Sequence, residues 1–244
     1  FPAGPARYLS PEWLEMVKWA ATEAKRLGMT LCMHNGPGWS SSGGAWITPA
    51  ESMQRVVWTE LKVESDGKEQ KFTPARPNAV CDYYEDIAVL AFPTPQADIR
   101  LKDYTLKSLG TNGYPPDRLQ PSPEEVPAGA IVRKEDVRRL TLNDDGSLVC
   151  TLPAGKWTLL RFGHTSTGTT SHPVNDVTGS GLECDKLSAQ AMDAFWEKGI
   201  QPILDYIGDL SGTVLNNLLI DSYEAGCGNW TPLFESEFLK RAGY

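Results

Sequence analysis

LLIDSYEAGCGNW, residues 218–230, joins an apolar run directly to two carboxylates, two aromatic side chains, an amide and two glycines. An apolar run that can be buried on both faces is typical of a parallel strand between helices, and (β/α) barrels place their sites at the carboxyl ends of such strands. We therefore expect a buried strand ending near Ile220, with a functional site in the polar cluster that follows. The alternative is a buried strand followed by an ordinary solvated loop.

The chain has 244 residues, enough for one large domain or two ordinary ones with a packed core. Its net charge is −8, from 31 acidic and 23 basic residues that are spread along the chain instead of forming a basic stripe. This distribution argues against a nucleic-acid partner and favours a neutral or cationic small ligand. The sequence as given contains no apolar run of transmembrane length and no leader-like segment, so no membrane insertion is expected.

The five cysteines are widely separated and contain no CxxC pair, which argues against a zinc knuckle or a disulfide scaffold. We expect most of them to be buried as small apolar residues. Several aromatic residues lie beside glycine and polar residues at predicted loop tips, a placement suited to stacking on a sugar. They are Trp39, Trp46, Tyr223 and Trp230, and the alternative is that they anchor the core.

The first part of the chain reads as a helix followed by a strand. Ser10-Pro11-Glu12 supplies an N-cap, a first-turn proline and an acid, apolar residues recur at helical spacing, and Gly28 supplies the stop. A helix over 11–27 and a strand over 29–33 are predicted. The strand leads into His34, which is either a hydrogen-bonded structural residue or a ligand contact. The glycine-rich stretch after it lacks the spacing of a phosphate-binding loop.

The middle of the chain changes to a β pattern. Strands are predicted at 56–64 and 87–93, a hairpin turn at 65–68, and a hairpin that joins 147–152 to 156–162. The simplest organisation is a β-rich module inserted into a barrel. We therefore assign residues 1–58 to a first barrel segment, 59–165 to the inserted module and 166–244 to a second, αβα barrel segment.

The last part returns to alternating helices and strands. Residues 163–172 form a polar, glycine-punctuated candidate rim loop, and GLECDK (181–186) brings two carboxylates to the start of a helix. Pro202 predicts a kink or break in that helix. Thr231-Pro232 predicts the start of a final helix.

Six separated stretches together resemble the glycoside hydrolase family one hundred and six α-L-rhamnosidases. They are YLSPEWLEMVKWAATEAKRLGM (8–29), HNGPGWSSSGGAWITP (34–49), YYEDIAVLAFPTP (83–95), RFGHTSTGT (161–169), GLECDKLS (181–188) and IDSYEAGCGNWTPLF (220–234). The resemblance implies an α/β fold, here a partial (β/α)8 TIM-type barrel with an inserted β-rich module. It also implies an inverting glycosidase, a bound calcium ion and a periplasmic or secreted bacterial protein that degrades plant polysaccharides. The chain covers only two or three βα units, so we expect the remaining barrel segments in a parent chain, and an inactive fragment without them.

Inverting glycoside hydrolysis needs one carboxylic acid to protonate the leaving oxygen and one carboxylate to activate water. Glu224 is the predicted general acid, because neighbouring aromatic rings and carboxylates favour the protonated form through desolvation and like charge. The resemblance points to the same residue. Asp221 is expected to hold a substrate hydroxyl or the surroundings of Glu224; a purely structural role is the alternative. Glu183 is the best general-base candidate within the chain. The alternative is a base on a later strand, which leaves Glu183 for substrate or calcium contact.

The remaining assignments complete the expected site. Glu183, Asp185 and Asp221 are the clustered acids available to calcium, without EF-hand spacing. The substrate-binding candidates are His34, Asn35, Trp39, His164, Asp221, Tyr223 and Trp230. Two other functions stay open: a non-catalytic carbohydrate-binding protein, and a glycosidase of another sugar specificity on the same scaffold.

Overall fold

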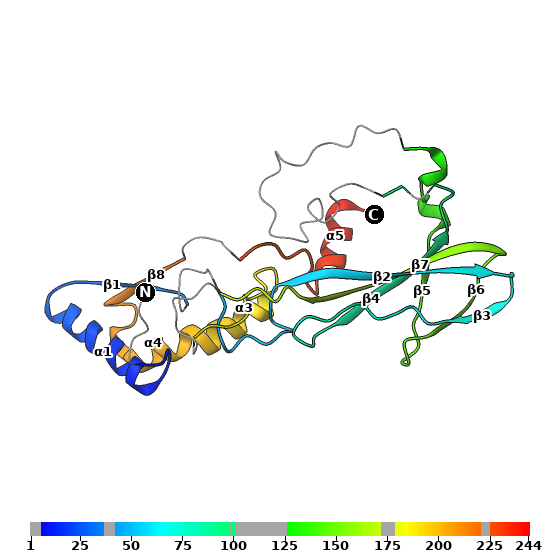
Figure 1. Cartoon of the computed structure of the whole chain (residues 1–244). Helices are drawn as coiled ribbons and strands as arrows, with labels where there is room; N and C mark the ends of the chain where they lie inside the picture. Colours follow the sequence, from blue (N-terminus) through cyan, green and yellow to red (C-terminus); the bar gives the residue numbers. More distant parts are fainter. Residues whose placement is uncertain (1–5, 37–41, 98, 101–125, 172–178, 221–224) are drawn as a thin grey trace. The chain divides into compact units, whose positions relative to one another are not determined.

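The computed structural model describes residues 6–36, 42–97, 99–100, 126–171, 179–220 and 225–244. The chain divides into two compact units (Figure 1). We call Phe1–Gln54 with Ser166–Tyr244 the terminal unit, and Arg55–Thr165 the insert. The described residues form a mixed α/β fold.

The first helix, α1 (Pro11–Arg26), forms as its sequence signals predict. The Ser10 side chain accepts a hydrogen bond from the Trp13 N–H at 3.2 Å, and Pro11 occupies the first turn. Gly28 ends the helix with φ +68°, a conformation that glycine adopts without strain. The buried face of α1 packs Ala21 and Ala24 against Val214, which places the helix beside the strand that follows Val214.

Strands β1 (Leu31–His34) and β8 (Leu215–Leu219) form a two-stranded parallel sheet. His34 lies opposite Leu219, so both strands end at the same edge. The expectation that the β8 region is buried on both faces is wrong: Leu219 is 43% exposed and Ile220 65%. Within the described residues β8 pairs with β1 alone, and this leaves its end uncovered.

The helix predicted after residue 187 is interrupted, as Pro202 indicates. α3 (Ala189–Phe195) leads into a π-helical turn, η4 (Trp196–Ile200), and then into α4 (Gln201–Ile207) and a 3₁₀ turn, η5 (Gly208–Leu210). Proline has no N–H for an intrahelical bond, and the wider turn before it accommodates this loss. Phe195 and Ile200 are buried in the main core cluster of the terminal unit.

The last helix of the terminal unit is α5 (Phe234–Ala242), which follows Thr231-Pro232 and ends at Gly243 in the left-handed conformation. No residue of α5 is buried among the described residues.

The insert is built from β-strands. A four-stranded sheet has the order β2 (Gln54–Ser65), β7 (Gly155–Ser166), β4 (Glu85–Pro93) and β5 (Arg138–Leu140). A second sheet pairs β3 (Glu69–Phe72) antiparallel with β6 (Leu148–Thr151). Short 3₁₀ turns η2 (Ala128–Ala130) and η3 (Lys134–Asp136) precede β5.

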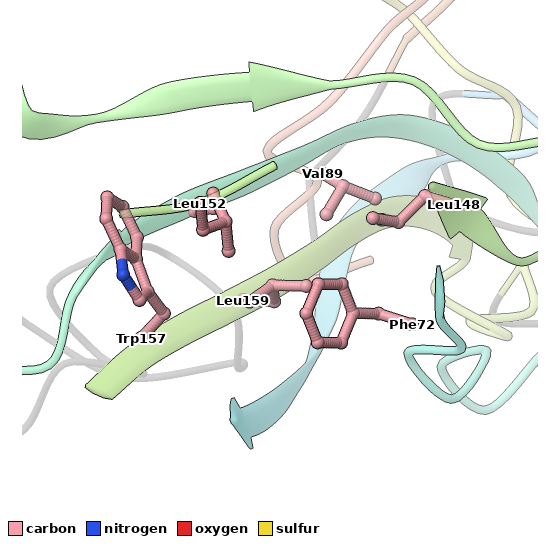
Figure 2. Close-up of a cluster of buried hydrophobic side chains, with 7 residues drawn as sticks. Phe72, Val89, Leu148, Leu152, Trp157 and Leu159 are labelled. Carbon is pink, nitrogen blue, oxygen red and sulfur yellow. The ribbon is translucent and has the colours of Figure 1, made fainter. Parts of the chain in front are cut away.

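Side chains from both sheets of the insert meet in one apolar core, shown in Figure 2. Its buried members are Phe72, Val89, Ala91, Leu148, Leu152, Trp157 and Leu159. The period-2 alternation of these strands is what brings the apolar side chains to one face.

The structure corrects three expectations about the β region. The turn at 65–68 does not close a hairpin, because β2 and β3 belong to different sheets. The predicted hairpin between 147–152 and 156–162 is wrong as well, since β6 pairs with β3 whereas β7 lies between β2 and β4. Residues 163–166 of the predicted rim loop are the end of β7.

All five cysteines are free, and the expectation that most are buried is wrong. Cys184 is buried, Cys150 and Cys227 are half-buried, and Cys32 and Cys81 are exposed. None of the described helices has the length and apolar composition needed to cross a bilayer.

Candidate functional site

Two loops leave the same edge of the terminal unit because β1 and β8 are parallel. We call residues 35–53 the β1 loop and residues 220–231 the β8 loop. The β1 loop begins at Asn35, which is buried and whose N–H donates to the Leu219 carbonyl at 3.3 Å. The sequence therefore correctly predicted two polar loops after apolar strands, and the structure places their starting points side by side (Figure 1).

Four predicted site residues lie outside the described part of the chain: Trp39 in the β1 loop, and Asp221, Tyr223 and Glu224 in the β8 loop. Their roles stay predictions.

The downstream end of the β8 loop is tightly packed. Ala225 is 2% exposed, and a Cβ added to Gly228 would lie 2.6 Å from Met53 Cγ. The Asn229 N–H donates to the Gln54 carbonyl at 3.0 Å. The loop that carries the predicted acid is thus fixed by contacts at the end where it rejoins the described chain.

A short stretch, residues 181–185, joins the β1 loop to the segment after β7. The Met53 N–H donates to the Glu183 carbonyl at 2.8 Å, and the Glu183 N–H donates to the Thr169 carbonyl at 2.9 Å. Gly44 forms an isolated bridge with Leu182. We call residues 181–185 the connecting segment, because it is hydrogen-bonded to residues on both sides.

Gly43 lets the β1 loop approach the connecting segment closely. Its φ is +128°, and a Cβ there would lie 2.9 Å from the Leu182 carbonyl oxygen and 3.2 Å from Glu183 Cα. This close approach gives the glycine run of the β1 loop a packing role.

Glu183 is the most deeply buried carboxylate among the described residues, with 0% exposure. Its Oε1 accepts a hydrogen bond from Ser42 Oγ at 3.1 Å and pairs with the Lys186 ammonium. Its Oε2 is buried and has no hydrogen-bond partner among the described residues. One oxygen of this carboxylate therefore accepts from two donors, while the other is buried without a donor among the described residues.

The Asp185 carboxylate accepts hydrogen bonds from the residues around it. Asp185 is 3% exposed; its Oδ1 accepts from the Leu187 N–H at 3.0 Å and its Oδ2 from Thr231 Oγ1 at 2.8 Å. The second bond ties the end of the β8 loop to the connecting segment.

The described residues do not assemble a calcium site. They contain no group of three or more His, Cys, Asp or Glu side chains placed to hold a metal ion. Calcium takes six to eight oxygen ligands, and Asp221, the third predicted ligand, lies outside the described part.

The two predicted histidines belong to different units. His34 ends β1, and its Nδ1 is buried without a hydrogen-bond partner among the described residues. His164 lies on β7 of the insert, where its Nε2 is 3.6 Å from Glu85 Oε2 and its ring meets the Tyr83 ring at a centroid distance of 5.9 Å. Their roles in a pocket stay predictions.

The two described tryptophans of the predicted loop tips have different surroundings. Trp46 stacks on Tyr8 with ring centroids 5.9 Å apart and packs with the main core of the terminal unit. Trp46 therefore packs as a core anchor, which is the alternative that the sequence had left open. Trp230 is half-buried at the end of the β8 loop, with its ring centroid 5.4 Å from that of Phe234.

Sequence reasoning missed the partners of the buried acids. Ser42, Lys186 and Thr231 were given no role in the site, although each binds a predicted site carboxylate. The spacing of Glu183 and Lys186, three residues apart, was the available signal for an ion pair.

A cavity of about 180 Å³ lies elsewhere, in the insert. Arg100 and Glu60 on its wall form two hydrogen bonds of 3.0 and 3.1 Å. None of the predicted site residues lines it.

Comparison with known proteins finds similarity to proteins described as glycosidases. A family model described as alpha-L-rhamnosidase matches residues 3–244. A protein of Formosa agariphila named "Putative beta-glucuronidase" is 48% identical over 246 residues; the match covers 100% of this chain and 21% of that protein. The structure of a rhamnosidase from Novosphingobium sp. PP1Y matches with a TM-score of 0.74 and 22% identity, covering 100% of this chain and 36% of that one. The chain therefore spans well under half the length of each.

Proposed function

The chain belongs to the alpha-L-rhamnosidase family of glycoside hydrolases, family one hundred and six, and on that premise we propose that the protein carrying it is an inverting α-L-rhamnosidase with Glu224 as its general acid. The observation that carries the proposal is the match of the family model over residues 3–244. The proposed substrates are plant-type polysaccharides or glycosides that contain rhamnose.

The geometry of the terminal unit supports this choice of site. The β1 and β8 loops start side by side, and the end of the β8 loop is held by Gln54 and Asp185. A general acid must be placed within hydrogen-bond reach of the leaving oxygen, and a loop with a fixed end serves that need.

In the proposed mechanism Glu224 donates its proton to the glycosidic oxygen as the bond to the sugar breaks. A carboxylate on the opposite face of the sugar, roughly 6.5–9.5 Å away, takes a proton from the attacking water. Glu183 is the candidate base within this chain, and a carboxylate elsewhere in a longer protein is the alternative. Asp221, Tyr223 and Trp230 surround Glu224 in this proposal, and His34, Asn35 and Trp39 contact the sugar.

The proposal also includes a (β/α)8 barrel, with β1 and β8 as two of its strands and further barrel segments in a longer chain. Its support is the parallel pairing of β1 with β8 and the barrel that the family resemblance implies. The proposal further includes a bacterial, exported enzyme of polysaccharide degradation, as the family resemblance implies.

The calcium ion that the family resemblance implies is not part of the proposed mechanism. The single open oxygen among the described carboxylates of the site, Glu183 Oε2, is next to an oxygen that already holds the Lys186 ammonium. A cation at Oε2 would be repelled by that ammonium. The described residues do not fit the ion, and no step of the mechanism depends on it.

A second specificity has its own support. The relative from Formosa agariphila is named as a beta-glucuronidase and is 48% identical to this chain. A β-glucuronidase would act on an acidic sugar on the same scaffold. A non-catalytic carbohydrate-binding protein is the remaining alternative.

One experiment separates these functions. The full-length protein is assayed against aryl α-L-rhamnoside, aryl β-D-glucuronide and other aryl glycosides, and the first-formed anomer is identified by NMR. The proposal predicts cleavage of the rhamnoside with inversion of the anomeric configuration. Turnover of the glucuronide alone would favour the second specificity, and sugar binding without any turnover would favour the binding protein.

A further inference from the structure

The Glu183 carboxylate is held in an unusual way for a buried acid. Its Oε1 receives two donors, from Ser42 and Lys186, while its Oε2 receives none among the described residues. A buried acceptor without a partner is costly, and such groups are retained where a ligand, an ion or an unseen water completes them.

The fold gives Glu183 little freedom to turn this oxygen elsewhere. Its main-chain N–H and carbonyl are both hydrogen-bonded, to Thr169 and Met53. Gly43 packs against its Cα closely enough that a Cβ there would lie only 3.2 Å away. The carboxylate is thus held from its backbone as well as from its tip.

The donors on Oε1 come from two different segments of the chain. Ser42 belongs to the β1 loop and is buried, with 1% exposure. Lys186 follows the connecting segment, and its side chain is 26% exposed. Ser42 therefore links Glu183 to the loop that starts beside the β8 loop.

We propose that Ser42 and Lys186 are positioning residues that hold Glu183 so that Oε2 accepts a hydrogen bond from a hydroxyl of the bound sugar. This inference rests on the proposed function, because the ligand class is a sugar. Under this inference Glu183 binds the substrate and is neither the general base nor a metal ligand.

The charge balance favours a hydroxyl over a cation. The Lys186 ammonium already balances the carboxylate through Oε1, so a second cation would face repulsion at short range. A neutral O–H donor meets no such repulsion, and its hydrogen bond to a charged acceptor is among the stronger ones.

The test measures binding and turnover separately in the full-length protein. Binding of L-rhamnose is followed by titration calorimetry, and hydrolysis of an aryl α-L-rhamnoside gives KM and kcat. The variants are Glu183→Gln, Ser42→Ala, Lys186→Met and Lys186→Arg. The matched control is Lys240→Met, which removes another lysine paired with a glutamate three residues away, here on the exposed surface of α5.

We expect Kd and KM to rise by about tenfold or more in Glu183→Gln and Lys186→Met, with kcat changed less. Lys186→Arg keeps a cation at Oε1 and should restore most of the affinity. Ser42→Ala should show a smaller rise in the same direction, and Lys240→Met none.

Lys186→Met leaves a buried carboxylate without its counter-ion and can fail to fold. Ser42→Ala removes only a neutral donor, so it keeps the inference testable in that case. Folding of each variant is checked by its thermal unfolding midpoint.

Unchanged Kd and KM in all folded variants would overturn the inference and leave the cluster a structural one. A loss of kcat with unchanged Kd in Glu183→Gln, together with rescue of Glu183→Ala by azide, would overturn it in favour of a general base. Failure of the proposed function is recognised in the wild type itself. A wild-type protein that neither binds L-rhamnose nor cleaves the rhamnoside refutes both.

Discussion

Thr231 donates a hydrogen bond from Oγ1 to Oδ2 of Asp185 at 2.8 Å, and this bond fastens the end of the β8 loop to the connecting segment. Thr231→Val keeps the shape of the side chain and removes the donor. Because the acceptor is a buried carboxylate, we expect a loss of about 1–3 kcal/mol in the free energy of unfolding. Urea denaturation measures it.

The exposed Thr73 offers a matched control, since Thr73→Val should change stability by no more than about 0.5 kcal/mol. Equal effects of the two substitutions would show that the bond to Asp185 does not fasten the loop.

The Tyr84 ring packs directly against Gly163 on β7, where there is no side chain to obstruct it. A Cβ at Gly163 would lie 2.4 Å from that ring, and the Tyr84 hydroxyl donates to Asp86 Oδ1 at 2.7 Å. Asp86 in turn accepts two hydrogen bonds of 2.8 Å from the buried Arg161. Gly163→Ala should therefore overpack the insert and lower the free energy of unfolding by about 1–3 kcal/mol.

The control for this substitution is Gly129→Ala, whose new Cβ would meet only the flexible Gln96 side chain, at 3.4 Å. Circular dichroism during thermal unfolding compares the two. A Gly163→Ala protein as stable as Gly129→Ala would contradict the tight packing of Tyr84.

The lowered pKa of Asp145 should account for part of the loss of stability of the insert at acidic pH. Hydrogen bonds from the Ser147 hydroxyl and N–H, and then the ion pair with Lys71, lower its pKa from 3.8 to about 2. A carboxylate with a lowered pKa contributes stability above its unfolded pKa and loses it as the pH falls through the folded value. Asp145→Asn should therefore flatten the fall of the unfolding midpoint between pH 4 and pH 2. An identical fall in the variant would contradict this assignment.

Cys184 should be unreactive in the folded protein. It is fully buried, and desolvation raises the pKa of its thiol to about 12. Since the thiolate is the reactive form, iodoacetamide at pH 8 should label the exposed Cys32 and Cys81 and spare Cys184 until urea is added. Mass spectrometry of the peptides reads the pattern, and rapid native labelling of Cys184 would show that its surroundings open.

The sequence predicted best the features that depend on near neighbours. α1 was predicted correctly because Ser10, Pro11 and Gly28 act within the helix they bound. The strand at β4 was also found, since its apolar run over 87–93 is a local signal. The pairing of β6 with β3 was missed, because which strand becomes a neighbour depends on contacts between distant parts of the chain.

The same division holds for the candidate site. The polar loops after β1 and β8 could be recognised as motifs in the sequence. The burial of Glu183 and its contact with Ser42 could not. These two residues are far apart in the sequence, and the close approach at Gly43, with the bridge between Gly44 and Leu182, brings them together. The exposure of Leu219 was missed because an apolar run does not reveal how many neighbours its strand has.

The central claim is that Glu224 protonates the leaving oxygen, and a comparison of leaving groups in the full-length Glu224→Gln variant tests it most directly. A phenyl α-L-rhamnoside needs that proton, whereas a dinitrophenyl α-L-rhamnoside leaves readily without it. The account predicts that kcat falls by about 10²–10⁴ for the phenyl substrate and far less for the dinitrophenyl one. Equal losses for both substrates, or near-wild-type kcat on the phenyl substrate, would contradict it.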